Sequence, residues 1–392
     1  MQTEYSTLYK IDSKGKIRQW SIYIEGNSYW TVTGIYNGKL ITNRPVAVEG
    51  KNTGRANETT PEGQALSEAE AKVTKQKESG YYENIDDIKK GKEYFEPMTA
   101  QPYKKYKDSL VLPVFVQPKL DGIRCIIRLE DGKLVARSRK GKVFDNLKHV
   151  LDELLVVFKH NENLILDGEL YNHELRHDFN KIASLVKKQG PKDGATQKKI
   201  DEWERYQWES EQLIRYHVYD CAFPGTVTTN LNPPTFAARF SNLKHACKQL
   251  KYTKIVETEK VNSFKDLDDI YDLYLQQGYE GQMIRTDSYY VNKRTKDLLK
   301  RKEFFDEEYE ILKVIEGTGN RAGMAGAVLI KCTEHPDGEV KSNIKGPRTF
   351  LTEVWNDKKN IVGKLATVQF PNKTPDGAPR FPYVIAIRDY EG

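Results

Sequence analysis

VQPKLDGIR, residues 116–124, closes an apolar run from Leu110 to Val116 that predicts a buried strand. Lys119 therefore stands at a strand end, between Pro118 and an Asp-Gly turn, which is an unusual place for a solvated surface charge. A lysine that is removed from water and flanked by other cations loses its proton more easily, and its free amine is then a nucleophile. A lone K-x-D-G is equally consistent with an ordinary strand end and turn, so the choice depends on the rest of the chain.

Two acids stand beside glycines at the edges of later apolar segments. The D-G-E of residues 167–169 ends one apolar run, and the E-G of residues 280–281 precedes another. A carboxylate at a strand end can bind a divalent metal or a ribose hydroxyl, although either acid taken alone could be a loop residue. Lys300 and Lys302 follow on one face of a predicted strand.

One candidate nucleophile, two acids and a lysine pair thus occur in a fixed order along the chain. Together they would supply an attacking amine, ligands for a divalent metal and cations for phosphate charge. Phosphoryl transfer needs this set, because its catalysis consists mainly of positioning and charge stabilisation. The positive charges of Lys300, Lys302 and Arg124 are expected to favour loss of the Lys119 proton.

Composition sets broad limits on the function. A chain of 392 residues has room for two or three domains, and a net charge of +6 permits a polyanionic partner without requiring one. The four cysteines include no C-x-x-C pair, which argues against a zinc site or a disulfide scaffold and favours a reducing compartment. We find no signal-peptide pattern and no apolar run of 18 residues, so we expect a cytoplasmic protein without a membrane contact.

The first part of the chain is predicted to form a small β-rich module over residues 1–85. Residues 19–24 and 29–33 are rich in aromatic and β-branched side chains, with a Glu-Gly-Asn turn between them. Residues 64–78 predict an exposed helix with charges at helical spacing. A polar linker is expected over residues 86–105.

The rest of the chain mixes helices and strands. Helices are predicted over 143–160, 179–187, 235–250 and 263–277, and the polar residues 187–210 predict a mobile surface insertion. Five short strands in the last 85 or so residues suit a small barrel of the OB type.

With these motifs in place, residues 110–390 resemble the covalent nucleotidyltransferase superfamily, and within it the ATP-dependent DNA ligases of phages and large DNA viruses. The matching pieces are K-x-D-G-x-R at residues 119–124, D-G-E, E-G, K-x-K and the Arg-Phe-Pro of residues 380–382. The resemblance implies an α+β multidomain chain. Its parts would be an ATP-grasp-like nucleotidyltransferase (adenylation) core over residues 106–303, a C-terminal OB-fold β-barrel over 304–392 and the N-terminal β-rich module.

The same resemblance implies roles for single residues. Lys119 would carry a covalent AMP, while Arg124 and Arg139 would contact ribose, phosphate or DNA. Glu169 would contact the ribose or Mg²⁺, and Glu280 would be a second metal-linked acid. Tyr219 would stack on adenine, Gln117 and Arg285 would contact the cofactor, Lys300 and Lys302 would contact the α-phosphate, and Arg380 and Arg388 would orient the leaving pyrophosphate.

Two positions depart from the pattern of the family. Gln117 stands where many DNA ligases carry a glutamate that reads the adenine amino group. Its carbonyl can accept the same hydrogen bond, but its amide donors weaken the argument for ATP over GTP. Arg285 stands where many relatives have a lysine, which preserves the charge but not the geometry.

The implied function is sealing of nicked double-stranded DNA by a monomer that uses ATP and Mg²⁺, in a phage- or virus-infected host cell, with the nucleus as a second location in a eukaryotic host. The N-terminal module resembles the WGR-like modules of some viral and phage joining enzymes, on residues 16–20, 50–52 and 57–62, although the Trp-Gly-Arg signature is absent. That resemblance implies DNA binding, and the alternative is a generic β module with core tryptophans.

Four alternatives remain. An RNA ligase shares the lysine, the acids and K-x-K, and a capping guanylyltransferase uses the same core with GTP. An NAD⁺-dependent ligase would bring a four-cysteine zinc module, which the cysteine spacing does not provide. A non-catalytic DNA-binding protein on a decayed core would not need the intact set of Lys119, the two acids and the lysine pair.

Overall fold

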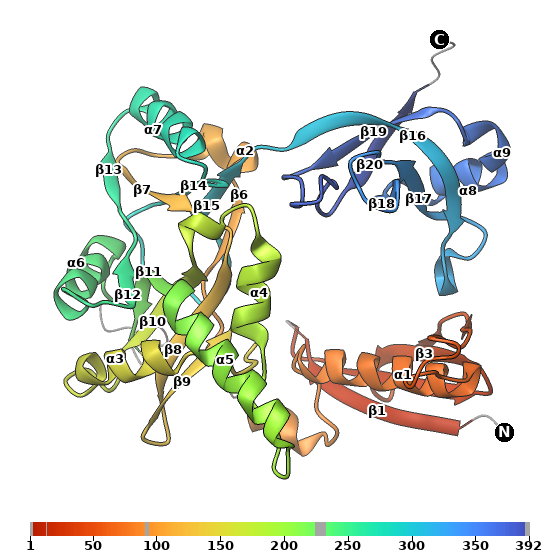
Figure 1. Ribbon diagram of the computed structural model, residues 1–392, viewed down its shortest axis with the longest axis horizontal. Helices are drawn as coiled ribbons and strands as arrows, with labels where there is room; N and C mark the ends of the chain where they lie inside the picture. The colour runs from red at the N-terminus through yellow and green to blue at the C-terminus, as the bar shows by residue number, and fades with distance from the viewer. Residues whose placement is uncertain (1–2, 13, 91–93, 224–232, 389–392) are drawn as a thin grey trace. The chain divides into compact units, whose positions relative to one another are not determined.

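The computed structural model of the chain describes residues 3–12, 14–90, 94–223 and 233–388 (Figure 1). It divides into two compact units, one of residues 94–303 and the other of residues 1–93 together with 304–392. Residues 91–93 of the predicted linker lie outside the described residues. Among the described helices, none combines the length and the apolar composition needed to cross a bilayer.

Residues 94–303 contain two five-stranded sheets. The first, which we call the Lys119 sheet, has the strand order β13-β7-β14-β15-β6, and the second, the Glu169 sheet, has the order β12-β11-β10-β8-β9. The strands of the Lys119 sheet are β6 (Thr99–Pro102), β7 (Val114–Lys119), β13 (Glu259–Val261), β14 (Gly281–Arg285) and β15 (Arg294–Lys302). Those of the Glu169 sheet are β8 (Ile123–Glu130), β9 (Lys133–Ser138), β10 (Ile165–Tyr171), β11 (Arg215–Ala222) and β12 (Thr253–Ile255).

Alternation along β7 decides which side chains reach the space between the sheets. Val114 and Val116 are fully buried in a cluster with Leu267 of α7 (Phe264–Gln276). Gln117 and Lys119 point to the opposite face, because successive strand residues alternate. On that face the two sheets pack through a second cluster, which includes Ile126 and Ile165 of the Glu169 sheet and Leu298 of β15.

The predicted linker over residues 86–105 contributes to the fold at its C-terminal end. Strand β6 pairs in parallel with β15, and the short helix α2 (Tyr103–Tyr106) follows it. The sequence TAQP of β6 has no alternating apolar pattern. Its pairing with β15 therefore could not be foreseen from local sequence.

Helices cover the outer face of the Glu169 sheet. The side chains buried between them form the largest hydrophobic cluster among the described residues. The helices are α3 (Lys148–Phe158), α4 (Phe179–Lys187), α5 (Gln197–Leu213) and α6 (Phe236–Ala246). The helix predicted over 143–160 begins only at Lys148. The residues before it are not helical, and among them Asn146 is buried and donates to the Leu185 carbonyl at 2.7 Å.

Residues 187–210, predicted to be a mobile surface insertion, are mostly helical. Most of this segment belongs to helix α5, which contacts α4. Ser210 is fully buried and donates to the Asn146 carbonyl at 3.0 Å, and Lys188 pairs with Glu202 at 2.6 Å. The helix packs through little apolar surface, which is why its polar sequence resembles a loop.

The N-terminal region forms a five-stranded antiparallel sheet with one helix, α1 (Pro61–Lys77). Its strands are β1 (Thr3–Ile11), β2 (Ile17–Glu25), β3 (Ser28–Ile35), β4 (Leu40–Thr42) and β5 (Val46–Ala47). The helix was predicted to be exposed, but Ala65, Ala69 and Val73 are buried, and the last two join a core with Trp20 and Ile22. Residues spaced by four lie on one helical face, and small side chains let that face approach the sheet.

The C-terminal region has the five predicted strands, and they pair in a closed ring in the order β16-β17-β18-β20-β19. Pairing of β16 with β19 completes the ring. The strands are β16 (Phe305–Glu316), β17 (Ala325–Lys331), β18 (Glu339–Ile344), β19 (Leu365–Phe370) and β20 (Tyr383–Arg388). Two helices that were not predicted, α8 (Arg348–Asn356) and α9 (Lys358–Ile361), lie between β18 and β19 in the sequence.

Candidate active site

Strand register brings the predicted lysines together on the Lys119 sheet. Gly281 of β14 pairs with Lys119 of β7 on one side and with Lys302 of β15 on the other. Two residues further along β14, Met283 pairs with Gln117 on one side and with Lys300 on the other. Lys119 and Lys302 are 183 positions apart in the sequence, yet they lie within three adjacent strands.

Two glycines allow the backbone to approach closely enough to form this arrangement. Gly281 has φ +149°, and a Cβ there would lie 2.2 Å from the Arg301 carbonyl oxygen. Just before it, the Glu280 N–H donates to the Lys119 carbonyl at 3.1 Å, which fixes the acid beside the lysine. A Cβ on Gly122 would lie 2.4 Å from the Leu170 carbonyl oxygen, so the turn after Lys119 also requires glycine.

The Glu280 carboxylate lies between two ammonium groups. It forms an ion pair with Lys119 through one oxygen and contacts Lys302 at 2.9 Å through the other. Burial raises the pKa of Glu280, but the two lysines outweigh this and lower it below its usual value. The pKa of Lys300 is lowered by burial and by the charges of Lys119 and Lys302. The three side chains of the Lys119–Glu280–Lys302 cluster remain 13–20% exposed.

Facing residues of the Glu169 sheet form a second charged group. Arg124 of β8 makes two hydrogen bonds to Asp167 of β10, at 2.9 and 2.5 Å. Tyr290 donates to the same carboxylate at 2.6 Å. Asp167 is 1% exposed, so this acid of the D-G-E motif holds Arg124 in place.

Glu169, the other acid of that motif, pairs across the sheet with Arg124 and His217. The Tyr219 hydroxyl donates to its carboxylate at 3.4 Å, and the Arg124 guanidinium lies 5.7 Å from the Tyr219 ring centre. Burial raises the pKa of Glu169 to about 7, although Lys119 and Arg124 oppose the shift. A carboxylate that is this costly to ionise would gain from an additional cation.

Gln117 and Arg285, both predicted to contact the cofactor, contact each other. Arg285 Nε donates to Gln117 Oε1 at 2.8 Å, and its Nη1 donates to Asp220 of β11 at 2.8 Å. The Gln117 amide donates to the Tyr219 carbonyl at 3.0 Å and to the Thr258 hydroxyl at 2.8 Å. Sequence reasoning missed Asp220 and Thr258, because neither stands in a recognisable motif and both meet their partners only through the fold.

The remaining predicted residues belong to other parts of the chain. Arg139 is exposed in the turn after β9, next to Ser138, which pairs with Cys125 on β8. Arg380 and Arg388 belong to the unit with the closed ring, before and at the end of β20. Arg388 donates to the Thr367 hydroxyl at 2.8 Å.

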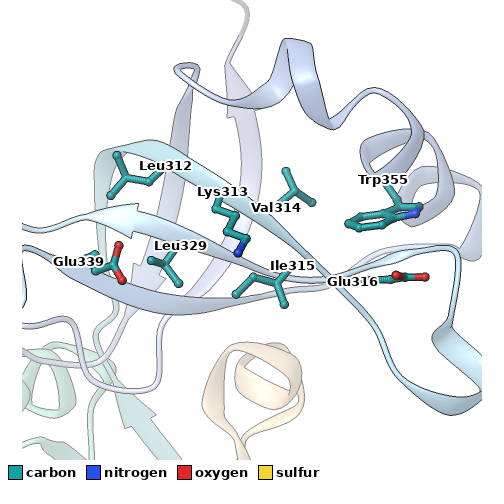
Figure 2. A pocket seen from close by; sticks show the side chains of 8 residues that line it. All are labelled: Leu312, Lys313, Val314, Ile315, Glu316, Leu329, Glu339 and Trp355. Atoms are coloured by element: carbon teal, nitrogen blue, oxygen red, sulfur yellow. The ribbon is translucent and has the colours of Figure 1, made fainter. Parts of the chain in front are cut away.

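A hollow of about 650 Å³ occurs on the closed ring, lined by β16, β17, β18 and α8 (Figure 2). Its charged lining includes Lys313, Glu316 and Glu339, and Trp355 of α8 forms part of its wall. None of the predicted site residues lines it.

Comparison with known proteins gives one family and several relatives. The family described as "ATP dependent DNA ligase domain" matches residues 97–302. The DNA ligase of Enterobacteria phage T4 is 23% identical over 308 residues, which cover 68% of this chain and 62% of that protein. The DNA ligase of African swine fever virus (isolate Pig/Kenya/KEN-50/1950) is 25% identical over 368 residues, which cover 87% and 78%. The chain therefore spans about three-fifths of the length of the phage relative.

Solved structures with a fold similar to that of this chain are also known. One named "Pmar-Lig_Pre." aligns with a TM-score of 0.61 at 25% identity, over 76% of this chain and 68% of that one. Another, described as "DNA binding with a minimal scaffold: Structure-function analysis of Lig E DNA ligases", has a TM-score of 0.56 at 22% identity and covers 75% of this chain and 100% of that one.

Proposed function

Because the chain belongs to the family of ATP-dependent DNA ligase domains, we propose that it is an ATP-dependent DNA ligase that seals nicks in duplex DNA through a covalent lysyl-AMP. The observation that supports this most directly is the Lys119–Glu280–Lys302 cluster. It combines a candidate nucleophile, an acid and a second cation at the partly exposed end of one sheet. The DNA ligases among its relatives favour DNA over RNA as the substrate.

The first step would form the lysyl-AMP. Lys119 Nζ bonds to the α-phosphorus of ATP, the bond from that phosphorus to the bridging oxygen breaks, and pyrophosphate leaves with the electron pair. The amine must lose its proton first, because an ammonium has no lone pair. The proton passes to water at this partly exposed cluster, and Lys300 and Lys302 would stabilise negative charge on the phosphates.

The adenosine end of the nucleotide would lie on the Glu169 sheet. We assign the Tyr219 ring to the adenine, since stacking on an aromatic side chain contributes about 1–3 kcal/mol per base. The Tyr219 hydroxyl contacts Glu169, so a base on this ring would bring its ribose close to the carboxylate. Arg124, held by Asp167, and the exposed Arg139 are assigned to ribose, phosphate or DNA.

Two further steps would complete the sealing. A 5′-phosphate oxygen of the nick attacks the phosphorus of lysyl-AMP, the P–N bond breaks and Lys119 regains a proton. The 3′-hydroxyl then attacks the 5′-phosphorus and loses its proton, and AMP departs. Every bond that forms is matched by one that breaks, and the net change is a sealed strand with ATP converted to AMP and pyrophosphate.

Glu169 and Glu280 fit a Mg²⁺ ion. This ion is usually held by one or two carboxylates together with substrate phosphates. Burial raises the pKa of Glu169, and a bound cation would offset that cost of ionising the carboxylate. Bound there, Mg²⁺ would neutralise phosphate charge.

We assign the regions that flank residues 94–303 to binding of the DNA duplex. We assign the closed ring to an OB fold, because five strands pair in a closed order, and its Arg380 and Arg388 to the leaving pyrophosphate. The N-terminal region would be the WGR-like module, which binds DNA mainly through phosphates. All these parts come from one chain, so we propose that it acts as a monomer.

The first step is tested by incubating the chain and Mg²⁺ with α-labelled ATP. We expect a labelled protein adduct that survives denaturation, that Lys119→Ala abolishes and that Lys159→Ala, at an exposed lysine beyond α3, retains. No adduct with ATP in the unaltered chain would refute the proposal. An adduct with GTP but not ATP would identify a capping-type enzyme.

The substrate is tested with nicked DNA, nicked RNA and hybrid duplexes of the same sequence. We expect sealing of nicked DNA and much weaker sealing of duplexes with two RNA strands, because their A-form shape and 2′-hydroxyls alter the backbone contacts. Preferential sealing of RNA would reassign the chain as an RNA ligase while leaving the lysyl-AMP step intact.

A further inference from the structure

Behind the proposed nucleotide site, four polar side chains form an unbroken buried row: Gln117, Arg285, Asp220 and Arg239. Their exposed fractions are 1%, 3%, 0% and 2%. Arg285 joins Gln117 to Asp220, and Arg239 of α6 makes two more bonds to Asp220, at 2.8 and 3.1 Å. Removing charges from water costs several kcal/mol per ion, so an arrangement of this kind needs almost every bond satisfied.

The buried row connects the two sheets that carry the site. Gln117 and Arg285 belong to the Lys119 sheet, whereas Asp220 belongs to β11 of the Glu169 sheet. Gln117 stands two residues before Lys119, and Asp220 follows Tyr219 directly. Arg285 therefore links the strand of the proposed nucleophile to the strand of the proposed base-stacking residue.

The row also fixes which way the Gln117 amide faces. An arginine only donates, so the Gln117 atom beside Arg285 must be the oxygen. The Tyr219 carbonyl only accepts, so the atom beside it must be the nitrogen. Both nitrogen hydrogens are then used, by the Tyr219 carbonyl and the Thr258 hydroxyl. The only hydrogen-bonding capacity that Gln117 retains is a lone pair on its oxygen.

Arg285 contacts the stacking residue as well. Its guanidinium lies 5.4 Å from the Tyr219 ring centre and 5.1 Å from that of Phe236, distances at which a cation is attracted to an aromatic face. One side chain thus acts on both the Gln117 amide and the Tyr219 ring.

We propose that Arg285 is a positioning residue that sets the preference for the nucleotide base, by holding Tyr219 in place and keeping Gln117 as a hydrogen-bond acceptor only. This rests on the proposed function. Adenine carries an amino donor where guanine carries an oxygen acceptor. A site whose amide has no free donor favours adenine, and its opposed lone pairs disfavour guanine. If Arg285 is lost, only the Tyr219 carbonyl and the Thr258 hydroxyl still hold the amide, so turning it to offer a donor costs less.

Arg285→Met tests this, because it removes both hydrogen bonds and keeps an unbranched buried side chain. Lys119 adduct formation is measured against ATP and GTP concentration. We expect the half-saturating ATP concentration to rise about tenfold and the preference for ATP over GTP to fall about tenfold, with the plateau rate for ATP within about twofold of the unaltered chain. An unchanged preference in a folded variant overturns the proposal.

Arg239→Met is the matched control. Arg239 is as buried as Arg285 and pairs with the same Asp220, but its other bonds go to the Pro234 and Ser288 carbonyls. We expect a similar fall in the thermal midpoint and an unchanged base preference. Equal loss of preference in both variants would show that Arg285 acts only through general stability, which overturns the proposal.

Two milder variants keep the test decisive if Arg285→Met does not fold. Thr258→Val removes one acceptor of the Gln117 amide and should lower the ATP preference about threefold with little effect on stability. Arg285→Lys should restore the thermal midpoint more fully than the preference, since one ammonium cannot reproduce both directed bonds. If both variants keep the ATP preference of the unaltered chain, the proposal is overturned. Absence of any ATP adduct in the unaltered chain would instead overturn the proposed function.

Discussion

Two groups of charges both include residues of the Lys119 sheet, and they differ in their contact with water. The Lys119–Glu280–Lys302 cluster has side chains that are 13–20% exposed, and its single acid is shared by two cations. The row through Gln117, Arg285 and Asp220 is at most 3% exposed, and it also has one acid between two cations. Both groups place one acid between two cations, but the two groups differ in exposure to water.

The difference shows which group can change during a reaction. In the buried row every charge has a directed partner, and moving one would leave another uncompensated in a medium of low polarity. In the exposed cluster, water and incoming phosphates can replace the Glu280 contacts at small cost. We therefore infer that the buried row sets geometry, while the exposed cluster performs chemistry.

The largest effect is expected where the buried row is broken. Asp220→Asn would leave Arg285 and Arg239 without their anion, and removing one partner of a buried pair typically costs about 3–5 kcal/mol. Asp152→Asn, in an exposed pair with Lys148, is the control and should change stability by less than about 0.5 kcal/mol. Urea unfolding of both variants measures the difference. Equal effects would show that burial does not distinguish these acids.

The equivalent acid-to-amide substitution in the partly exposed Lys119–Glu280–Lys302 cluster should affect activity instead of stability. Glu280→Gln keeps the size of the side chain but removes the charge between Lys119 and Lys302. We expect lysyl-AMP formation to fall about 100-fold, equivalent to about 2.7 kcal/mol, with a stability change of less than about 1 kcal/mol. Single-turnover labelling and urea unfolding separate the two quantities. A loss of stability as large as that of Asp220→Asn would remove the distinction between the two groups.

A partly buried titratable group on β11, His217, allows a test by pH. Burial, followed by the charges of Lys254, His173 and Arg215, lowers the pKa of His217 to about 4. The unfolded chain, with a histidine pKa near 6.5, binds a proton between about pH 6.5 and 4 that the folded chain does not. Stability should therefore fall as the pH drops through this window, by about 3 kcal/mol. His217→Gln should remove that part of the slope in unfolding measured at several pH values, and an unchanged slope would contradict the assignment.

The two groups also differ in how far sequence could predict them. Lys119, Glu280 and the Lys300–Lys302 pair stand in short motifs, and strand alternation already places both lysines of the pair on one face. The buried row has no such signal. Arg285 was predicted to contact the cofactor because of its place after the E-G motif, whereas its partners in the structure are Gln117 and Asp220. Those bonds span 168 and 65 positions of sequence, which no local pattern reports.

The prediction of secondary structure failed at two helices for a related reason. Helix α5 and the buried face of α1 were misjudged because both pack through small or polar groups, such as Ser210 and Ala69. Apolar periodicity identifies elements that bury large side chains, and α4, which buries Ile182 and Leu185, was predicted with its observed bounds. Where a segment packs through hydrogen bonds, such as those of Asn146, its sequence has no apolar periodicity. The contact then cannot be predicted before the partners are known.

The smallest effect should come from the cation at the edge of the exposed cluster. Lys302→Met removes one of several charges that would meet the triphosphate, so we expect the half-saturating ATP concentration to rise about tenfold, equivalent to about 1.4 kcal/mol. Lys296→Met, at an exposed lysine earlier on β15, is the control and should leave it unchanged. Because Lys302 is 19% exposed, the difference between the two variants should shrink as salt is raised from 0.05 to about 0.5 M. A difference that does not depend on salt would mean that Lys302 acts through a fixed buried contact, as Arg285 does, and would place it in the other group.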